Sequence, residues 1–503
     1  MKYKGRYILI VTLLWGSLFF NSQAQAKALS RTIDFRVMPL SNLFYQIDCL
    51  AGQGHCSESV YRELWDSLEW DQRDQEALKR WVALKSKYQQ QIFFPSSQTF
   101  KTDLPGRFEG FSMWKKIRLA SLNAKNMKHF QSQMGLIMRP NDAAELTLLM
   151  GYWEPRFMSW WSQGPEKTLQ KQAGIFAKLL FSPAIRSLLS QAEAFYEADF
   201  QGHVRLNFNL MYRPQNKYKN VNGEQVENNS IVEVLEDKDP REVLDIVVHE
   251  LCHYYYRSAP YLTHLKTIQG FTSQKSRAAM GSYNLLNEAL ATAIGNGLIS
   301  QTIMSEDKFQ RYISTPKSFY NDTYIDQAAK ALMPELKKYL NQKQKLSQSE
   351  VIQNMSRIMK SALKSSLTRP EVLLKTMALG TPSNLNKGFI YQAISPRSTW
   401  GADIHSPRLL KTLISSPAMS ALIFMPLKDL YLLKDWQGLL SRHQIRQLTS
   451  IKTPSVYTFP KSNNSNMYFI TGDTPTDFKT GLESLLSQSS NSRQKQLHRV
   501  SQF

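Results

Sequence analysis

Cysteine is scarce in this sequence, with three residues among 503, and this number excludes a fold held together mainly by disulfides. Cys49 and Cys56 flank a short glycine-containing stretch, a spacing that predicts one small disulfide loop and an oxidising compartment. Cys252 then has no partner. Because it lies within an apolar helical pattern, we expect it to be a buried free thiol.

Long apolar runs are absent beyond the N-terminus, so we expect no transmembrane anchor in the mature chain. The one such run, residues 7–20, follows three basic residues and precedes the small residues of 24–26, which is typical of a signal peptide over residues 1–26. No cysteine follows these small residues, which argues against a bacterial lipoprotein. An uncleaved anchor is the alternative, but the run is short for a membrane span. The sequence therefore predicts export to the periplasm or the extracellular medium.

Acidic residues are outnumbered, with 41 Asp and Glu against 62 Lys and Arg and a formal net charge of +21 at pH 7. Such an excess favours association with anionic polymers of the cell envelope. The basic residues are scattered along the chain and are not gathered in one arm or helix. We therefore expect a solvated basic surface and no specific nucleic-acid binding.

No repeat of fixed period occurs. Apolar residues recur at helical spacing from about residue 58 to 196, so residues 27–200 are predicted to form a helical N-terminal domain. The pattern then changes. Residues 204–210 alternate as a half-buried strand does, an Asn222-Gly223 turn follows, and residues 230–235 form a second β-rich run. We place this second run along the edge of the predicted cleft.

Three further segments are predicted from start and stop signals. Asp239 is suited to cap a helix over 240–257. The stretch 258–282 is rich in Gly, Ser and Thr and is predicted to be mainly loop, with His264 exposed. A second helix is expected at 284–294, ended by the glycines that follow.

The C-terminal third has a different character. Short β-like runs alternate with helical ones, at residues 389–394, 421–424 and 467–471. This pattern predicts a small α/β domain over 346–490. Residues 491–503 are polar and basic and are predicted to form a tail.

Histidine is also scarce, with nine residues, yet two of them stand in the motif His249-Glu250-Leu251-Cys252-His253. The i, i+4 spacing places both imidazoles on one helix face, where they can reach a single ion. Neutral imidazoles bind Zn²⁺ at about 2.0 to 2.1 Å, and the metal lowers the pKa of its bound water toward about 7. Glu250 would then accept the proton of that water. The alternative is that both histidines make ordinary polar contacts.

A tetrahedral catalytic site needs a third protein ligand, and Glu288, in Asn287-Glu288-Ala289, is the best candidate. In these two motifs the sequence resembles the gluzincin group of metallopeptidases, although no particular family within the group is identified. The resemblance covers residues 245–294. It implies a zincin-like core with one catalytic zinc ion, Glu250 as general base, and three ligands: His249, His253 and Glu288. The alternative for Glu288 is a surface carboxylate, with the true ligand elsewhere.

The sequence departs from the pattern of this group at two points. The segment between His253 and Glu288 is longer than in the thermolysin-like pattern, and Thr292 stands where that pattern has a supporting Asp. No His-x-x-Gly-x-x-His continuation follows His253, which argues against the metzincin pattern.

The sequence therefore predicts an exported zinc metallopeptidase that hydrolyses a peptide or protein substrate. The expected fold class is α+β, with a zincin-like catalytic core over 201–345 between the helical N-terminal domain and the small C-terminal domain. Two alternatives remain: a catalytically inactive zincin-fold protein, and a metal-free cationic protein that binds the envelope. Zincins commonly use a Tyr or His downstream of the third ligand to stabilise the oxyanion. For this role Tyr324 is preferred over Tyr320, with His405 in reserve.

Overall fold

The structure is a computed structural model that describes residues 31–52, 58–89, 91–93, 111–200, 204–214, 221, 223–236, 239–394, 396 and 398–487. The predicted signal peptide and tail lie outside these residues. The fold is mixed α/β, as predicted at the level of fold class. It divides into two compact units, one formed from within residues 1–86, 115–186 and 198–250, the other from within 87–114, 187–197 and 251–503. The division falls inside one unbroken helix, α10 (Leu244–Ser258).

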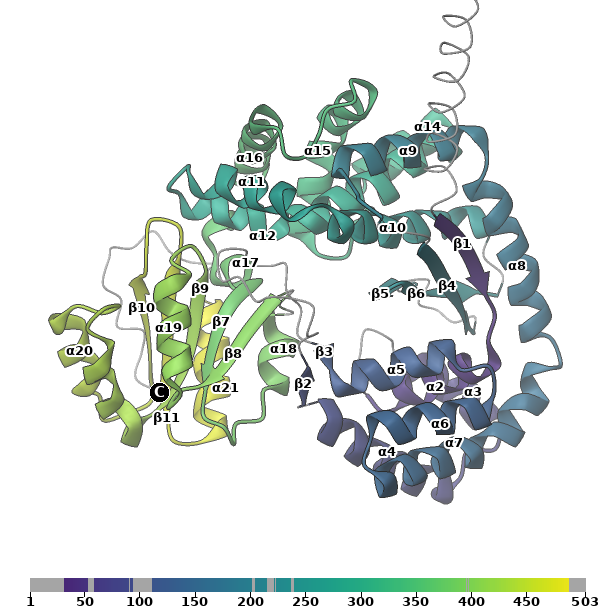
Figure 1. The fold of residues 1–503 in the computed structure, drawn as a ribbon, viewed down its shortest axis with the longest axis horizontal. Coiled ribbons are helices and arrows are strands. Elements are labelled where there is room, and N and C mark those ends of the chain that lie inside the picture. Colours follow the sequence, from purple (N-terminus) through teal and green to yellow (C-terminus); the bar gives the residue numbers. More distant parts are fainter. Residues whose placement is uncertain are drawn as a thin grey trace, which may run out of the picture. The chain divides into compact units, whose positions relative to one another are not determined.

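The first unit is built on a four-stranded sheet with strand order β1-β4-β6-β5, which can be followed in Figure 1. The strands are β1 (Arg31–Arg36), β4 (Val204–Arg213), β6 (Asn229–Leu235) and β5 (Gly223–Val226). Strands β1, β4 and β6 run parallel to one another, and β5 is antiparallel to β6. The helices of this unit are α2 (Pro39–Leu50), α3 (Glu58–Ser67), most of α4 (Gln72–Gln89) and α5 (Met113–Asn123), α6 (Met127–Ile137), α7 (Pro140–Trp161) and α8 (Pro165–Leu180).

The segment after the predicted signal peptide contributes a strand that the sequence pattern did not indicate. Strand β1 pairs with β4 from Arg31 opposite Val204 to Arg36 opposite Asn209. Asn42 of α2 then clamps β4, because its amide nitrogen donates to the carbonyl of Leu210 at 3.0 Å and its amide oxygen accepts from the backbone of Tyr212 at 2.7 Å. Strand β1 and helix α2 therefore belong to the same compact unit as β4.

Strand β4 forms as predicted, but the prediction of a half-buried strand is wrong, since every residue from Leu206 to Arg213 is buried. The alternating polar residues Asn207 and Asn209 do not face water. Both side-chain amide nitrogens lie 3.2 Å from Asn229 Oδ1 on the neighbouring strand. Alternation along this strand reflects buried polar contacts rather than a solvated face.

Of the predicted Asn222-Gly223 turn, Asn222 lies outside the described residues, and the predicted edge strand is wrong in placement. Gly223 begins β5, and the turn of the β5–β6 hairpin lies at Glu227, whose φ is +54°. Strand β6, which contains the predicted edge run 230–235, lies between β4 and β5. Among the described residues the sheet therefore ends at β5, a strand of four residues.

A buried group of charges fastens the helices of the first unit to the sheet. Glu233 of β6 accepts from the hydroxyls of Tyr45 and Tyr61 at 3.1 and 3.2 Å. The guanidinium of Arg213 donates to its other oxygen at 2.8 Å. In the same unit Lys85 pairs with Asp48 at 2.6 Å, with both side chains at most 9% exposed. Buried charges of this kind are tolerated because each one is paired and hydrogen-bonded.

The second unit contains a group of helices that follows the first half of α10. Two predictions fail here. The stretch predicted as loop forms α11 and the start of α12, with His264 buried on α11. The glycines predicted to end the second helix instead lie in a π-helical continuation, η2, where a Cβ on Gly297 would lie 2.9 Å from Phe319 and 3.0 Å from Met333. The helices are α9 (Pro183–Tyr196, in large part), α11 (Tyr261–Thr272), α12 (Arg277–Thr292), η2 (Ala293–Ile299), α13 (Ser300–Ile303), α14 (Glu306–Ser314), α15 (Thr323–Asn341), α16 (Ser349–Leu363), η3 (Lys364–Thr368) and α17 (Pro370–Leu373).

The C-terminal part of this unit is a five-stranded sheet of order β10-β11-β9-β7-β8, with only β10 antiparallel to its neighbour. Along β9, Ile423 packs into one apolar core with α19 and α20, and Phe424 into another with α18 and α21. Successive side chains of a strand point to opposite faces, so this sheet is covered on both sides. The elements are β7 (Thr376–Thr381), α18 (Gly388–Ile394), β8 (Ser398–Asp403), α19 (Pro407–Ser415), β9 (Ser420–Pro426), η4 (Leu427–Trp436), α20 (Arg442–Thr449), β10 (Ser455–Pro460), β11 (Asn466–Gly472) and α21 (Pro475–Ser487). A two-residue strand pair, β2 (Ile92–Phe93) with β3 (Phe111–Ser112), also belongs to this unit.

Two of the three predicted β-like runs are confirmed in this sheet, within β9 and β11. The prediction for residues 389–394 is wrong, because they form helix α18. A short apolar run fits a buried strand or a buried helix equally well. Here Ile390 and Ile394, four residues apart, pack onto the sheet from one side of a helix.

The cysteines agree with the predicted redox state as far as the structure describes them. Cys49 is disulfide-bonded, and Cys252 is a buried cysteine outside any disulfide. The predicted partner, Cys56, lies outside the described residues. Within the described ranges no single helix is long and apolar enough to cross a membrane; only α8 and α9 taken together, sharply bent at their junction, have the required length and composition.

Replacing Arg213 with Met should destabilise the protein by about 3–5 kcal/mol, because it leaves the buried Glu233 charge without its cation. Urea unfolding measures this loss. The double variant Arg213→Met, Glu233→Leu should recover much of it, because neither charge then remains in the interior. Equal losses in the single and double variants would contradict this account.

Candidate metal centre

Helix α10 carries the His-Glu motif on a helix that is otherwise packed into the core. The helix begins at Leu244, about one turn later than predicted, because Asp239 binds the backbone N–H and the guanidinium of Arg241 and Pro240–Glu242 form a 3₁₀ turn. Its fully buried apolar side chains are Leu244, Val247, Val248, Leu251, Cys252 and Tyr255.

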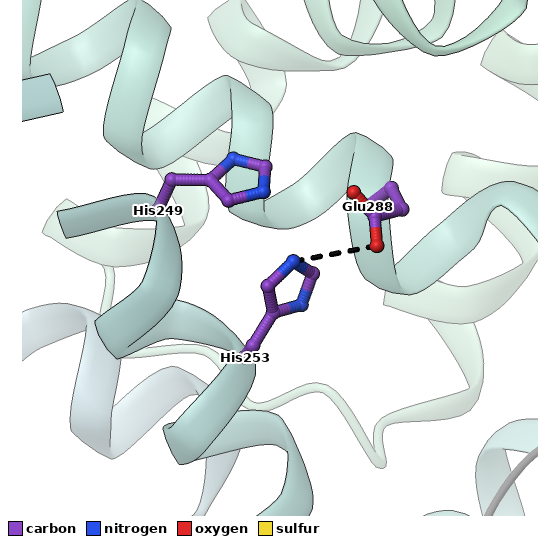
Figure 2. Close-up of side chains that lie close together, drawn as sticks. All are labelled: His249, His253 and Glu288. Atoms are coloured by element: carbon purple, nitrogen blue, oxygen red, sulfur yellow. Dashed lines mark ion pairs between the residues drawn. The ribbon is translucent and has the colours of Figure 1, made fainter. Parts of the chain in front are cut away.

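The three predicted ligands lie together. His249 and His253 project from α10 toward Glu288 of α12 (Figure 2), and one potential ligand atom of each lies within 4.8 Å of the others. The relation between the two histidines is set by one turn of a continuous helix. Among the described residues this is the only group of three His, Cys, Asp or Glu side chains with such spacing.

The contact between His253 and Glu288 has the dimensions of a ligand pair. His253 Nε2 lies 3.3 Å from Glu288 Oε1. Two ligand atoms of a tetrahedral zinc ion are about 3.3 Å apart when each lies about 2.0 to 2.1 Å from the metal. The two atoms are thus spaced as two corners of one tetrahedron.

Asn287 determines which nitrogen of His253 faces this position. Asn287 Oδ1 lies 3.2 Å from His253 Nδ1, and an amide oxygen can only accept, so Nδ1 carries the hydrogen. Nε2 then presents a lone pair to the Glu288 carboxylate. Two acceptors at this distance repel each other unless a cation or a proton lies between them. The donor set therefore suits a divalent cation, with Asn287 orienting one ligand.

Helix α12 is held by hydrogen bonds on one side of Glu288 and carries a buried polar residue on the other. One turn before it, the Asn284 amide donates to the carbonyls of Val372 and Leu373, both at 3.1 Å. One turn after it, Thr292 is fully buried, and its hydroxyl has no hydrogen-bond partner among the described residues. A neutral side chain thus occupies the position of the supporting Asp in the thermolysin-like pattern.

Glu250 is buried against the edge strand of the sheet. It is 5% exposed, and a Cβ built on Gly223 would lie 2.6 Å from its Oε1 and 2.7 Å from Ile246. Burial raises the pKa of Glu250 to about 7; His249 and Lys115 oppose this rise, while the charge of Glu224 adds to it. A carboxyl with a pKa near 7 can both accept and release a proton at neutral pH.

The predicted oxyanion donors are placed as follows. Tyr324, in the first turn of α15, accepts from Arg369 at 2.7 Å and donates to Glu371 at 3.1 Å. Tyr320 is half-buried just before that helix. His405 lies at the end of β8, between Asp403 at 2.8 Å and Asp429 at 3.6 Å. Their part in catalysis stays a prediction.

Sequence reasoning missed four contributors to this site. Asn287 stood in the motif that identified Glu288, but its contact with His253 depends on how two helices meet. Gly223 was interpreted as a turn residue, and its close approach to Glu250 became visible only in the structure. Lys115 and Glu224 belong to no motif.

Substituting Gly223 with Ala should cost about 1–3 kcal/mol of stability, because the new methyl group overlaps Glu250 and Ile246. Chemical denaturation measures this loss. Gly151→Ala is the matched control, since nothing lies within 4 Å of a Cβ at that position in α7. Unchanged stability of Gly223→Ala would show that β5 does not pack closely against Glu250.

Wild-type protein should bind one zinc ion, and His249→Ala or His253→Ala should lose it, because two remaining ligands hold the ion too weakly. Metal analysis after dialysis measures this. His443→Ala, at an exposed position of α20, is the control. Stoichiometric zinc in both variants would refute the assignment, and full retention in Glu288→Ala alone would point to another third ligand.

In comparisons with known proteins, no family model, curated protein or solved structure matches this chain.

Proposed function

We propose that the protein is an exported zinc-dependent metallopeptidase that hydrolyses peptide bonds with a metal-activated water molecule. The observation that carries this proposal is the grouping of His249, His253 and Glu288, with Glu250 in the same motif. Two imidazoles and one carboxylate form the ligand set of open catalytic zinc sites, in which a fourth position remains for water or substrate.

The three grouped side chains would hold the ion, and Asn287 would fix the tautomer of His253 that leaves Nε2 available. When bound, zinc lowers the pKa of a water molecule toward about 7 and polarises the substrate carbonyl.

Glu250 is the proton carrier of the proposed reaction. Its carboxylate takes a proton from the attacking water and later gives it to the nitrogen of the leaving amine. Burial against Gly223 suits this cycle, because a carboxyl with a pKa of about 7 is not locked in one protonation state at neutral pH. A Tyr hydroxyl, from Tyr324 or Tyr320, would complete the stabilisation of the oxyanion.

Strand β5 supports a peptide as the substrate. It is the last strand of its sheet among the described residues and lies directly against Glu250. An extended peptide can add to such an edge through backbone hydrogen bonds. This position replaces the one predicted for residues 230–235, which lie inside the sheet.

Glu250→Gln should keep its zinc and its fold but lose about 10²- to 10⁴-fold in kcat, because an amide cannot accept the proton of water. Cleavage of a mixed peptide library, together with metal content, measures this. Glu242→Gln is the control, since that carboxylate is exposed one turn before α10.

The same experiment separates the alternatives. Zinc without cleavage in wild type would favour an inactive zincin-fold protein, and protein without zinc would favour a metal-free cationic envelope protein. An active Glu250→Gln variant would refute the assigned base.

A further inference from the structure

Strand β5 presents different chemistry on its two faces. The Cβ direction of Gly223 leads to Glu250 and Ile246 of α10. Because successive residues of a strand point to opposite faces, Glu224 points the other way, toward helix α5. There Arg118 donates to both of its oxygens, at 2.5 and 3.2 Å.

A second cation lies beside this pair. Lys115 stands one turn before Arg118 on the same face of α5, and its Nζ lies 3.9 Å from Glu224 Oε1. Lys115 therefore lies beside the edge strand, and two cationic side chains face Glu224.

The group is partly open to solvent. The side chains of Lys115, Arg118 and Glu224 are 20%, 18% and 21% exposed. A solute can therefore reach them, while the surrounding protein limits screening by water. Charge pairs at such partly buried positions are stronger than those on an open surface.

A peptide added to β5 would follow the same alternation. The side chain opposite Gly223 would face α10 and Glu250, and the neighbouring side chain would face α5. Its charge would then meet Lys115 and Arg118 rather than the metal ligands. This step rests on the proposed peptidase function.

We propose that Lys115 and Arg118 form a carboxylate-recognition site that selects substrates carrying a negative charge one residue away from the position facing Glu250. The carboxylate can come from an acidic side chain or from the C-terminus of the peptide. Arg118 holds Glu224 and the strand, and Lys115 determines the charge preference.

The test uses quenched peptides in which one residue, moved through the positions flanking the cleaved bond, is Glu, Gln or Lys. At one position wild type should prefer Glu over Gln by about tenfold in kcat/KM, mainly through KM, as for a hydrogen bond to a charged group. Lys115→Glu should reverse the order and prefer Lys. Lys116→Glu, the same charge change 100° around α5, should keep the wild-type order.

A second pair of peptides distinguishes the two sources of the carboxylate. If the preference depends on a free rather than an amidated C-terminus, the site recognises the terminal carboxylate. If it depends on an internal Glu, the site recognises a side chain. Either result supports the proposal. An identical order of peptides in wild type and Lys115→Glu overturns it.

Binding separates this inference from the proposed function. Fluorescence anisotropy measures the binding of labelled Glu and Gln peptides to the zinc-loaded Glu250→Gln variant, with and without Lys115→Glu. This measurement needs no turnover. If the Glu peptide binds more tightly than the Gln peptide, and Lys115→Glu abolishes this difference, the carboxylate site is supported even if wild type cleaves nothing. Cleavage with no charge preference in rate or binding refutes the site and leaves the peptidase function standing.

Discussion

The carboxylate of Glu250 is buried against the backbone of β5 at Gly223, and the proposed chemistry depends on this contact. The approach is possible only because residue 223 has no side chain. Burial raises the pKa of Glu250 to about 7, and the contact with Gly223 limits where its carboxylate can lie. It also brings the edge strand, where a peptide can pair, next to the helix that carries His249.

That contact in turn requires a rigid sheet. Strand β5 has four residues and is supported by β6, β4 and β1 in succession. Glu233, Arg213 and the hydroxyls of Tyr45 and Tyr61 tie the sheet to α2 and α3, and Arg118 ties β5 itself to α5. Hydrogen bonds between buried charges are directional, so these contacts fix strand position more closely than apolar packing alone.

The sequence predicted the parts of the site that are local. Two histidines four residues apart on a helix must share a face, and the Asn-Glu-Ala motif identified Glu288 before its distance to His253 was known. Contacts between distant segments left no such signal. The pairing of β1 with β4 joins residues more than 160 positions apart. Asn207 and Asn209 alternate with apolar residues as on a solvated strand, although both are buried. The glycines of η2 are typical of a helix end in sequence, but both lie in a continuous helix, and Gly297 packs closely against Phe319 and Met333.

The charges around the site explain why a substrate carboxylate would suit it. Thr292 brings no charge where the thermolysin-like pattern has an Asp, so the two motifs supply two carboxylates, those of Glu288 and Glu250. These two would balance a zinc dication when both are ionised. On the other face of β5, Lys115 and Arg118 both pair with Glu224. A bound peptide with a carboxylate there would offset positive charge that the protein itself concentrates beside the edge strand.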